Sequence, residues 1–267
     1  MRYFKRHWLV GLEVEIVISS PWSVRPPRLQ NMIAKRIKNN LRRLRTVFQE
    51  RIYVNPKTEE DIIASFHKLY YDGLHLLEKN ELEPSWLGTN VCKYPFDLWV
   101  YQEILFELHP DLIIECGTRY GGSALFFASI CDLLDYGHVL TIDVQEQERR
   151  PQHSRITYLT GSSTSSTVVS TVAEAAEESP KVLVCLDSDH QMEHVLEELR
   201  IYSQFVNVGS YVIVEDSNVN GHPVYRDHGP GPMEAIERFL EENDKFVVDK
   251  TREKFLITFI PKGTPTE

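Results

Sequence analysis

Two short apolar runs of the chain, 182–186 and 211–214, each end in acidic residues. Runs of this kind are typical of buried parallel strands. A helix and a return strand fit between them, so the two ends become neighbours at one edge of a sheet. Carboxylates that converge there repel one another unless a cation neutralises them, and oxygen ligands suit a hard ion. The pattern therefore predicts a magnesium site at Asp187, Glu215 and Asp216.

One histidine, His190, follows the first of these acids by three residues. Beside a cation, an imidazole of near-neutral pKa can take a proton from a hydroxyl group, so we expect His190 to be the catalytic base. The alternative is a side chain that merely begins the next helix. The letters HQMEH, ending at His194, also match the H-x-x-E-H pattern of zinc hydrolases. That match starts at a strand end and lacks an evident third ligand, so His194 is expected to be structural.

A glycine-rich turn, ECGTRYGGS, follows another apolar run. Gly117 allows a sharp turn, and Gly121 and Gly122 would let a ligand approach the start of the next helix. The spacing is not that of a dinucleotide loop, and the Lys-Ser/Thr pair of a triphosphate loop is missing. Glu115 suits an ammonium or sulfonium group, and Asp143, at the end of the next strand, suits ribose hydroxyls. Together they predict a site for S-adenosylmethionine.

Strand-like and helix-like segments alternate from about residue 95 onward. This alternation indicates a parallel α/β sheet with helices on both faces. The expected strands are 111–117, 138–144, 156–161, 181–187, 210–216, 245–250 and 254–261, and the expected helices are 95–108, 121–134, one ending near 178, 192–206 and 231–243.

The N-terminal part of the chain has a different character. Residues 1–50 hold eleven Lys or Arg against three Glu, although the whole chain has a formal net charge of −10. Segment 31–48 forms an apolar stripe among basic residues, which we expect to pack on its own domain or on a second subunit; contact with an anionic membrane surface is the alternative. Another helix is expected from Thr58. We therefore expect a mainly helical extension over 1–84, acting as a substrate lid or as the contact of a homo-oligomer.

Composition and charge argue against nucleic-acid binding and membrane insertion and indicate a reducing compartment. The acidic balance argues against nucleic acid, whose phosphates bind basic surfaces. The four scattered cysteines form no C-x-x-C pair and fit a reducing cytoplasm. The apolar stretch near the N-terminus is interrupted by Glu13 and Glu15 and is too short to cross a bilayer, so we expect no stable membrane insertion.

Several stretches resemble the cephalosporin hydroxylase/rhamnosyl O-methyltransferase family over about residues 85–262: SWLGTNVCKYPFDLWVYQEIL, IIECGTRYGGSAL, LDSDH, VIVEDSNVNGHPV and GPGPMEAIERFL. The resemblance implies a Rossmann-like class I methyltransferase domain over 85–267, whose sheet has seven strands with the last antiparallel. Related magnesium-dependent sugar O-methyltransferases carry D-x-x-H and then an E-D pair. Their pattern falls on Asp187, His190, Glu215 and Asp216 and implies three metal ligands and a base, with Asp189 as a rival ligand.

Residues and resemblance together predict a magnesium-dependent, S-adenosylmethionine-dependent O-methyltransferase that acts on a hydroxyl of a sugar or natural product. The rivals are a zinc hydrolase built on His190 and His194 and a non-catalytic protein that binds S-adenosylmethionine. The resemblance also places the segment GSSTSS near the adenine. The expected cofactor residues are Glu115, Gly117, Thr118, Gly121, Gly122, Ser123, Asp143, Ser163 and Asp187.

Overall fold

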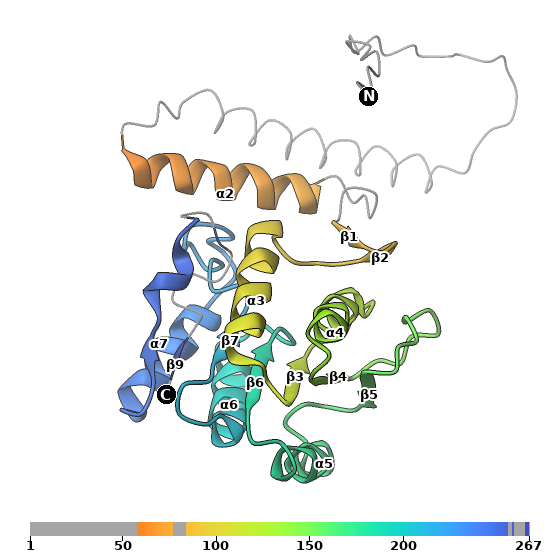
Figure 1. Ribbon diagram of the computed structural model, residues 1–267. Coiled ribbons are helices and arrows are strands. Elements are labelled where there is room, and N and C mark those ends of the chain that lie inside the picture. Colours follow the sequence, from red (N-terminus) through yellow and green to blue (C-terminus); the bar gives the residue numbers. More distant parts are fainter. Residues whose placement is uncertain (1–57, 77–83, 256–257, 259–264, 267) are drawn as a thin grey trace, which may run out of the picture. The chain divides into compact units, whose positions relative to one another are not determined.

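The computed structural model describes residues 58–76, 84–255, 258 and 265–266, which all belong to one compact unit of the chain. The expectations for residues 1–57 lie outside this part. A five-stranded sheet of order β5-β4-β3-β6-β7 lies at the centre (Figure 1), and every neighbouring pair is parallel. Its strands are β3 (Leu112–Cys116), β4 (His138–Asp143), β5 (Ile156–Thr160), β6 (Val182–Leu186) and β7 (Val212–Val214).

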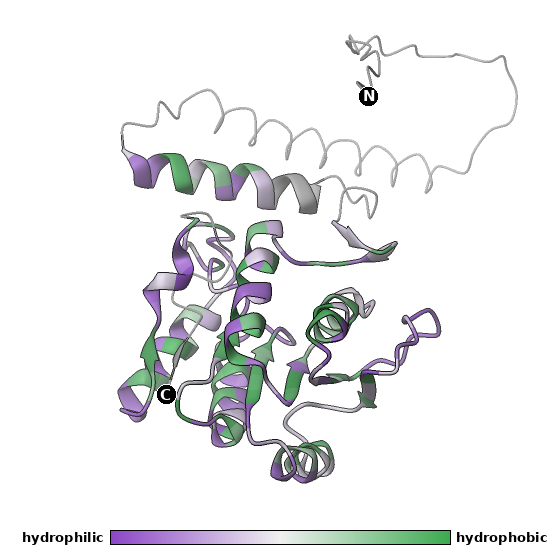
Figure 2. Ribbon diagram, viewed as in Figure 1, coloured by the Kyte–Doolittle hydropathy of each residue, from purple (hydrophilic) through white to green (hydrophobic). Residues whose placement is uncertain are grey.

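Helices cover both faces of this sheet. Successive side chains of a strand point to opposite faces, so Ile113 and Ile114 enter two different cores. Both β3 and β6 are buried along their whole length; β6 is a continuous apolar run, and β3 is apolar except for Glu115 (Figure 2). One core contains α3 (Pro95–Leu108) and α4 (Gly122–Leu134), and the other contains α5 (Ser166–Glu177), α6 (Met192–Tyr202) and α7 (Pro232–Glu242).

The helices begin where the sequence supplies capping groups. Pro95 stands in the first turn of α3, where a missing N–H costs nothing. At α5, the Ser165 side chain accepts a hydrogen bond from a backbone N–H of the first turn. At α7, the Glu234 side chain accepts a hydrogen bond of 2.7 Å from the Gly231 backbone N–H. These local signals explain why the predicted helix starts agree with the structure.

The helix predicted from Thr58 is confirmed as α2 (Glu59–Leu76). The Asp61 backbone N–H donates to Thr58 Oγ1 at 3.1 Å, and the Thr58 N–H donates to the Asp61 carboxylate at 3.2 Å. Tyr71 of α2 belongs to a small apolar cluster with Tyr94 and Val224. A hairpin of β1 (Ser85–Trp86) and β2 (Thr89–Asn90) comes between α2 and α3. Among the helices that the structure describes, none has the length and apolar character needed to cross a membrane.

The last two expected strands, 245–250 and 254–261, differ from the structure in part. Only β8 (Val247–Val248) is a strand in the first of them, and it pairs antiparallel with β9 (Pro265–Thr266) in a separate two-stranded sheet. A 3-10 turn, η3 (Lys250–Glu253), follows β8 because Asp249 Oδ1 accepts a hydrogen bond from a backbone N–H of that turn. Residues 256–257 and 259–264 lie outside the described part, so a seventh strand stays a prediction. A second 3-10 turn, η2 (Ser203–Phe205), extends α6.

Candidate active site

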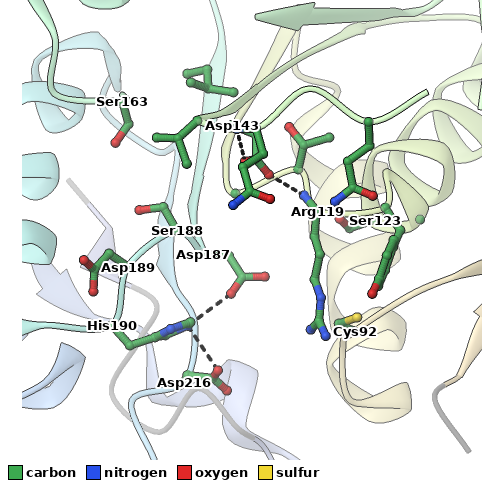
Figure 3. A pocket seen from close by; sticks show the side chains of 18 of the residues that line it. Cys92, Arg119, Ser123, Asp143, Ser163, Asp187, Ser188, Asp189, His190 and Asp216 are labelled. Carbon is green, nitrogen blue, oxygen red and sulfur yellow. Dashed lines mark hydrogen bonds and ion pairs between the residues drawn. The ribbon is translucent and has the colours of Figure 1, made fainter. Parts of the chain in front are cut away.

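A cavity of about 470 Å³ lies at the carboxyl ends of the strands (Figure 3), the edge at which parallel α/β sheets bind ligands. Neither Glu115, Gly121 nor Glu215 is among the residues that line it. The remaining residues that we assigned to the cofactor, the metal and the base from the sequence do line it: Gly117, Thr118, Gly122, Ser123, Asp143, Ser163, Asp187, His190 and Asp216.

Two glycines of the turn make room for neighbouring backbone. Gly117 has φ +103°, and a Cβ built on it would lie 1.8 Å from the Asp187 carbonyl oxygen. A Cβ on Gly122 would lie 2.0 Å from the Asn90 carbonyl oxygen. The Asp187 backbone N–H also donates to the Cys116 carbonyl at 2.7 Å. The glycine turn therefore packs against the end of β6, which carries the acidic residues.

The acid at the end of β4, Asp143, is held by hydrogen bonds from the glycine-rich turn and from its own loop. Its carboxylate accepts hydrogen bonds from the backbone N–H groups of Arg119, at 2.7 Å, and Gln145, at 2.8 Å. The Arg150 guanidinium lies 3.2 Å from the same carboxylate. These contacts fix the Asp143 side chain beside the cavity, as Figure 3 shows.

The acid of β3, Glu115, is completely buried. Its Oε2 accepts a hydrogen bond of 2.6 Å from Thr141, whereas its Oε1 has no hydrogen-bond partner among the described residues. Burial raises the pKa of Glu115 to about 7, against the opposing effect of the Lys93 ammonium group. Glu115 is thus a buried carboxyl group two residues before the cavity wall at Gly117.

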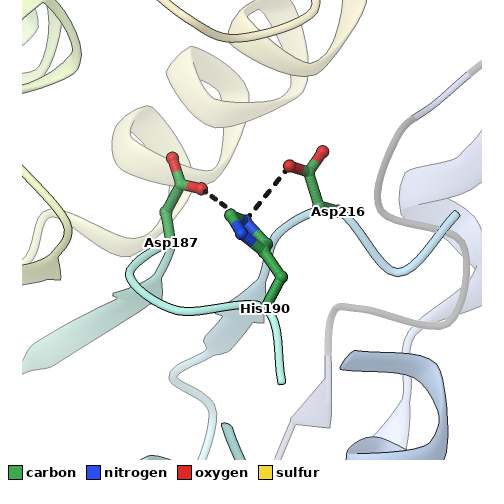
Figure 4. Close-up of side chains that lie close together, drawn as sticks. All are labelled: Asp187, His190 and Asp216. Atoms are coloured by element: carbon green, nitrogen blue, oxygen red, sulfur yellow. Dashed lines mark hydrogen bonds and ion pairs between the residues drawn. The ribbon is translucent and has the colours of Figure 1, made fainter. Parts of the chain in front are cut away.

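The acids after β6 and β7 meet around His190 (Figure 4). His190 Nε2 lies 3.4 Å from Asp187 Oδ1 and 3.1 Å from Asp216 Oδ2, and one ligand atom of each residue lies within 4.8 Å of the others. Burial alone would lower the pKa of His190, but hydrogen bonds and charges from the two carboxylates raise it well above the usual value. This group has the composition of a metal site. Asp189 is exposed and instead accepts a hydrogen bond from the Gln191 N–H at 3.0 Å.

The structure keeps Glu215 out of this group. A buried lysine that the sequence did not suggest, Lys93, places Nζ 2.8 Å from both Glu215 Oε1 and Asp187 Oδ2. The Tyr101 hydroxyl donates to the same Glu215 oxygen. Burial alone would lower the pKa of Lys93, but the surrounding acidic groups raise it well above its usual value. Lys93 lies 94 and 122 positions before its two partners, so no local spacing could have predicted it.

The second histidine of HQMEH belongs to a different cluster. His194 Nε2 lies 3.3 Å from the buried Glu198 carboxylate, and this hydrogen bond raises the pKa of His194. The Ser163 and Ser188 hydroxyls lie 3.3 and 3.2 Å from the same nitrogen. Because His190 faces Asp187 instead, the two imidazoles do not converge on one point, as the zinc-hydrolase reading requires.

The sheet order, with helices on both faces, is that of a Rossmann-like α/β fold. Two solved structures of CmcI share it. An apo structure has a TM-score of 0.55 and 21% identity and covers 69% of this chain and 76% of CmcI. One with Mg-SAM has a TM-score of 0.51 and 19% identity and covers 68% and 75%. Identity at this level establishes the fold alone.

The sequence relatives are closer. The family model for rhamnosyl O-methyltransferase/CmcI matches residues 79–264. A rhamnosyl O-methyltransferase of Mycobacterium bovis is 39% identical over 229 residues, which is 83% of this chain and 90% of the relative. One of Mycobacterium leprae is 38% identical over 212 residues, 76% of this chain and 90% of the relative. The chain therefore belongs to the rhamnosyl O-methyltransferase/CmcI family.

Proposed function

We propose that this protein transfers a methyl group from S-adenosylmethionine to a hydroxyl group of a sugar or related natural product, and that the transfer depends on Mg²⁺. Its family membership makes the chain an S-adenosylmethionine-dependent O-methyltransferase, and its mycobacterial relatives are named for rhamnosyl acceptors. The observation that carries the magnesium dependence is the cluster of Asp187, His190 and Asp216 at the cavity wall.

The chemistry of the cavity suits the cofactor. The buried Glu115 Oε1 has no hydrogen-bond partner within the described ranges, but this side chain does not line the cavity, so its contact with the ammonium group of S-adenosylmethionine stays a prediction. Asp143 lines the cavity at the end of β4, and each carboxylate oxygen can accept a further hydrogen bond, as ribose hydroxyls would donate. Ser163 lines the part where we expect the adenine.

The carboxylates also suit a divalent cation. Asp187 and Asp216 would hold the magnesium ion, and bound there it would supply positive charge opposite the oxyanion that develops on the acceptor. Glu215 stays a predicted ligand. Because Lys93 and Tyr101 engage its Oε1, only its second oxygen is left for that role.

His190 would take the proton of the acceptor hydroxyl. The carboxylates of Asp187 and Asp216 lie at 3.4 and 3.1 Å and would stabilise the imidazolium that results. A cation shared by these carboxylates would also reduce their effect on the pKa of His190, so that the imidazole is neutral before it accepts the proton.

Methyl transfer to a simple rhamnoside, followed by mass spectrometry, tests the proposal. We expect a chelator to abolish turnover and added Mg²⁺, but not Zn²⁺, to restore it. Asp216→Ala should lower turnover at least ~100-fold, with nearly unchanged affinity for S-adenosylhomocysteine in calorimetry. The matched control is Asp244→Ala, because Asp244 is an exposed acid that does not line the cavity.

Each outcome separates the proposal from its rivals. Turnover that is insensitive to chelation, or equal loss from both aspartate variants, would contradict the magnesium site. Tight binding of S-adenosylhomocysteine without turnover on any hydroxylated acceptor would indicate the non-catalytic alternative. The extension over 1–84, the methyltransferase domain over 85–267, the homo-oligomer and the cytoplasmic location stay predictions.

A further inference from the structure

A buried carboxylate lies behind one wall of the cavity. Glu198 of α6 is completely buried, and its Oε1 accepts hydrogen bonds from the Ser163 hydroxyl at 2.5 Å and from the Ser188 hydroxyl at 2.6 Å. His194 Nε2 lies 3.3 Å from the same oxygen. The other oxygen, Oε2, has no hydrogen-bond partner among the residues described. One carboxylate oxygen therefore contacts three polar side chains.

All three of these side chains line the cavity, and they come from different segments. Ser163 follows β5, Ser188 follows β6, and His194 lies on α6. Figure 3 shows Ser163 and Ser188 on the side of the cavity opposite Ser123. The Tyr202 hydroxyl donates to the Ser163 carbonyl oxygen at 2.7 Å, which also fixes this segment. Several hydrogen bonds from buried groups therefore fix this part of the cavity wall.

Packing alone does not account for Glu198. The buried face of α6 is otherwise made of residues such as Val195, Leu199 and Tyr202, which are all nearly inaccessible to solvent. A carboxylate on that face loses its hydration, and an apolar side chain would fit the same position at lower cost. The hydrogen bonds of Glu198 are made with side chains that line the cavity. We therefore look for its role in how it orients those side chains.

The carboxylate fixes the direction of the hydroxyl protons. Both serine hydroxyls donate their single proton to Glu198 Oε1. His194 Nε2, which lies close to both hydroxyls, is hydrogen-bonded to the same carboxylate. The Ser163 and Ser188 oxygens then have only lone pairs left for a ligand. Such a wall favours a ligand N–H donor and disfavours a carbonyl oxygen, which would face two acceptors.

We propose that Glu198 is a positioning residue that makes the cofactor site selective for a 6-aminopurine over a 6-oxopurine. It does so because it accepts the hydroxyl protons of Ser163 and Ser188, which leaves their oxygens as acceptors. The inference rests on the proposed function, in which the cavity holds S-adenosylmethionine with its adenine near Ser163. Glu198 acts through the two serines and does not touch the cofactor itself.

Calorimetric titration of the full chain with two ligands tests this inference. One is S-adenosylhomocysteine, and the other is S-inosylhomocysteine, which carries a carbonyl group at position 6 of the purine. We expect the wild-type protein to prefer the amino form at least ~10-fold. Glu198→Gln frees a hydroxyl proton and adds an amide donor, so the preference should fall below about threefold. The matched control, Glu197→Gln, changes an exposed neighbour on the same helix and should keep the full preference.

A second variant guards against a folding defect. Ser163→Ala removes one of the two acceptors and keeps the Glu198 side chain with its hydrogen bond from Ser188, and it should also reduce the ratio of the two affinities. A merely structural role would weaken both ligands equally and leave that ratio unchanged, which would overturn the inference. Failure of the wild-type protein to bind S-adenosylhomocysteine would instead overturn the proposed function. Binding of both ligands with equal affinity by the wild type would overturn the inference alone.

Discussion

Replacing Lys93 by methionine tests the electrostatics of the acid cluster. The variant removes the ammonium group that lies 2.8 Å from both Asp187 and Glu215. The Lys93 and Glu215 side chains are only 1% and 6% exposed, so water could not replace the lost charge at Glu215. Removing one partner of a buried ion pair costs about 3–5 kcal/mol of unfolding free energy. Because Asp187 is 20% exposed and partly hydrated, we expect the low end, about 3 kcal/mol.

Urea denaturation measures this loss as the difference in unfolding free energy between Lys93→Met and the wild type. Lys245 is exposed, and Lys245→Met should change the unfolding free energy by less than about 0.5 kcal/mol. Saturating Mg²⁺ should stabilise Lys93→Met more than the wild type, because a cation at Asp187 offsets the missing charge. A loss of less than about 1 kcal/mol would refute the reasoning, since that is no more than one ordinary hydrogen bond.

Two further predictions concern the turn and the strand before it. Gly117→Ala should cost more than about 3 kcal/mol, because its Cβ would lie 1.8 Å from the Asp187 carbonyl oxygen; Gly209→Ala, also at positive φ but in open space, should cost only about 1 kcal/mol, and thermal unfolding compares the two. Burial raises the pKa of Glu115 from 4.5 to about 7, so the folded state keeps a proton that the unfolded state has lost. Wild-type stability should therefore fall by up to about 3 kcal/mol as the pH rises through this window, and Glu115→Gln should lack that fall in denaturation curves taken from pH 4 to 8.

The sequence is sufficient to predict the sheet and the place of the site. Strands β6 and β7 are buried along their whole length and are unbroken apolar runs in the sequence. The other three strands of the main sheet are recognised because short apolar, β-branched segments alternate with helical ones. Parallel strands also bring their carboxyl ends to one edge. That rule alone predicts the meeting of Asp187 and Asp216, 29 positions apart, at His190. Both inferences use only local pattern and topology.

The groups that tune the site are not predictable in this way. Lys93 meets its partners across long sequence separations, and its position in the chain gives no sign of burial. Glu198 carries a weak signal, because it lies three residues after Val195 and four before Tyr202, on the apolar stripe of its helix. An acid on such a stripe marks a buried polar network, but the sequence does not say what the network contacts. Tertiary packing decides that.

The contact between Gly117 and the Asp187 carbonyl has a consequence for engineering new acceptors. Main-chain atoms at the ends of two adjacent strands meet here, so they would set the spacing between the proposed sites of the methyl donor and the cation. The line along which an oxygen would reach the methyl carbon would then be determined by the sheet. Laboratory evolution toward other sugars should then accumulate changes in the segments after β7, and changes at residues 115–117 should be rejected.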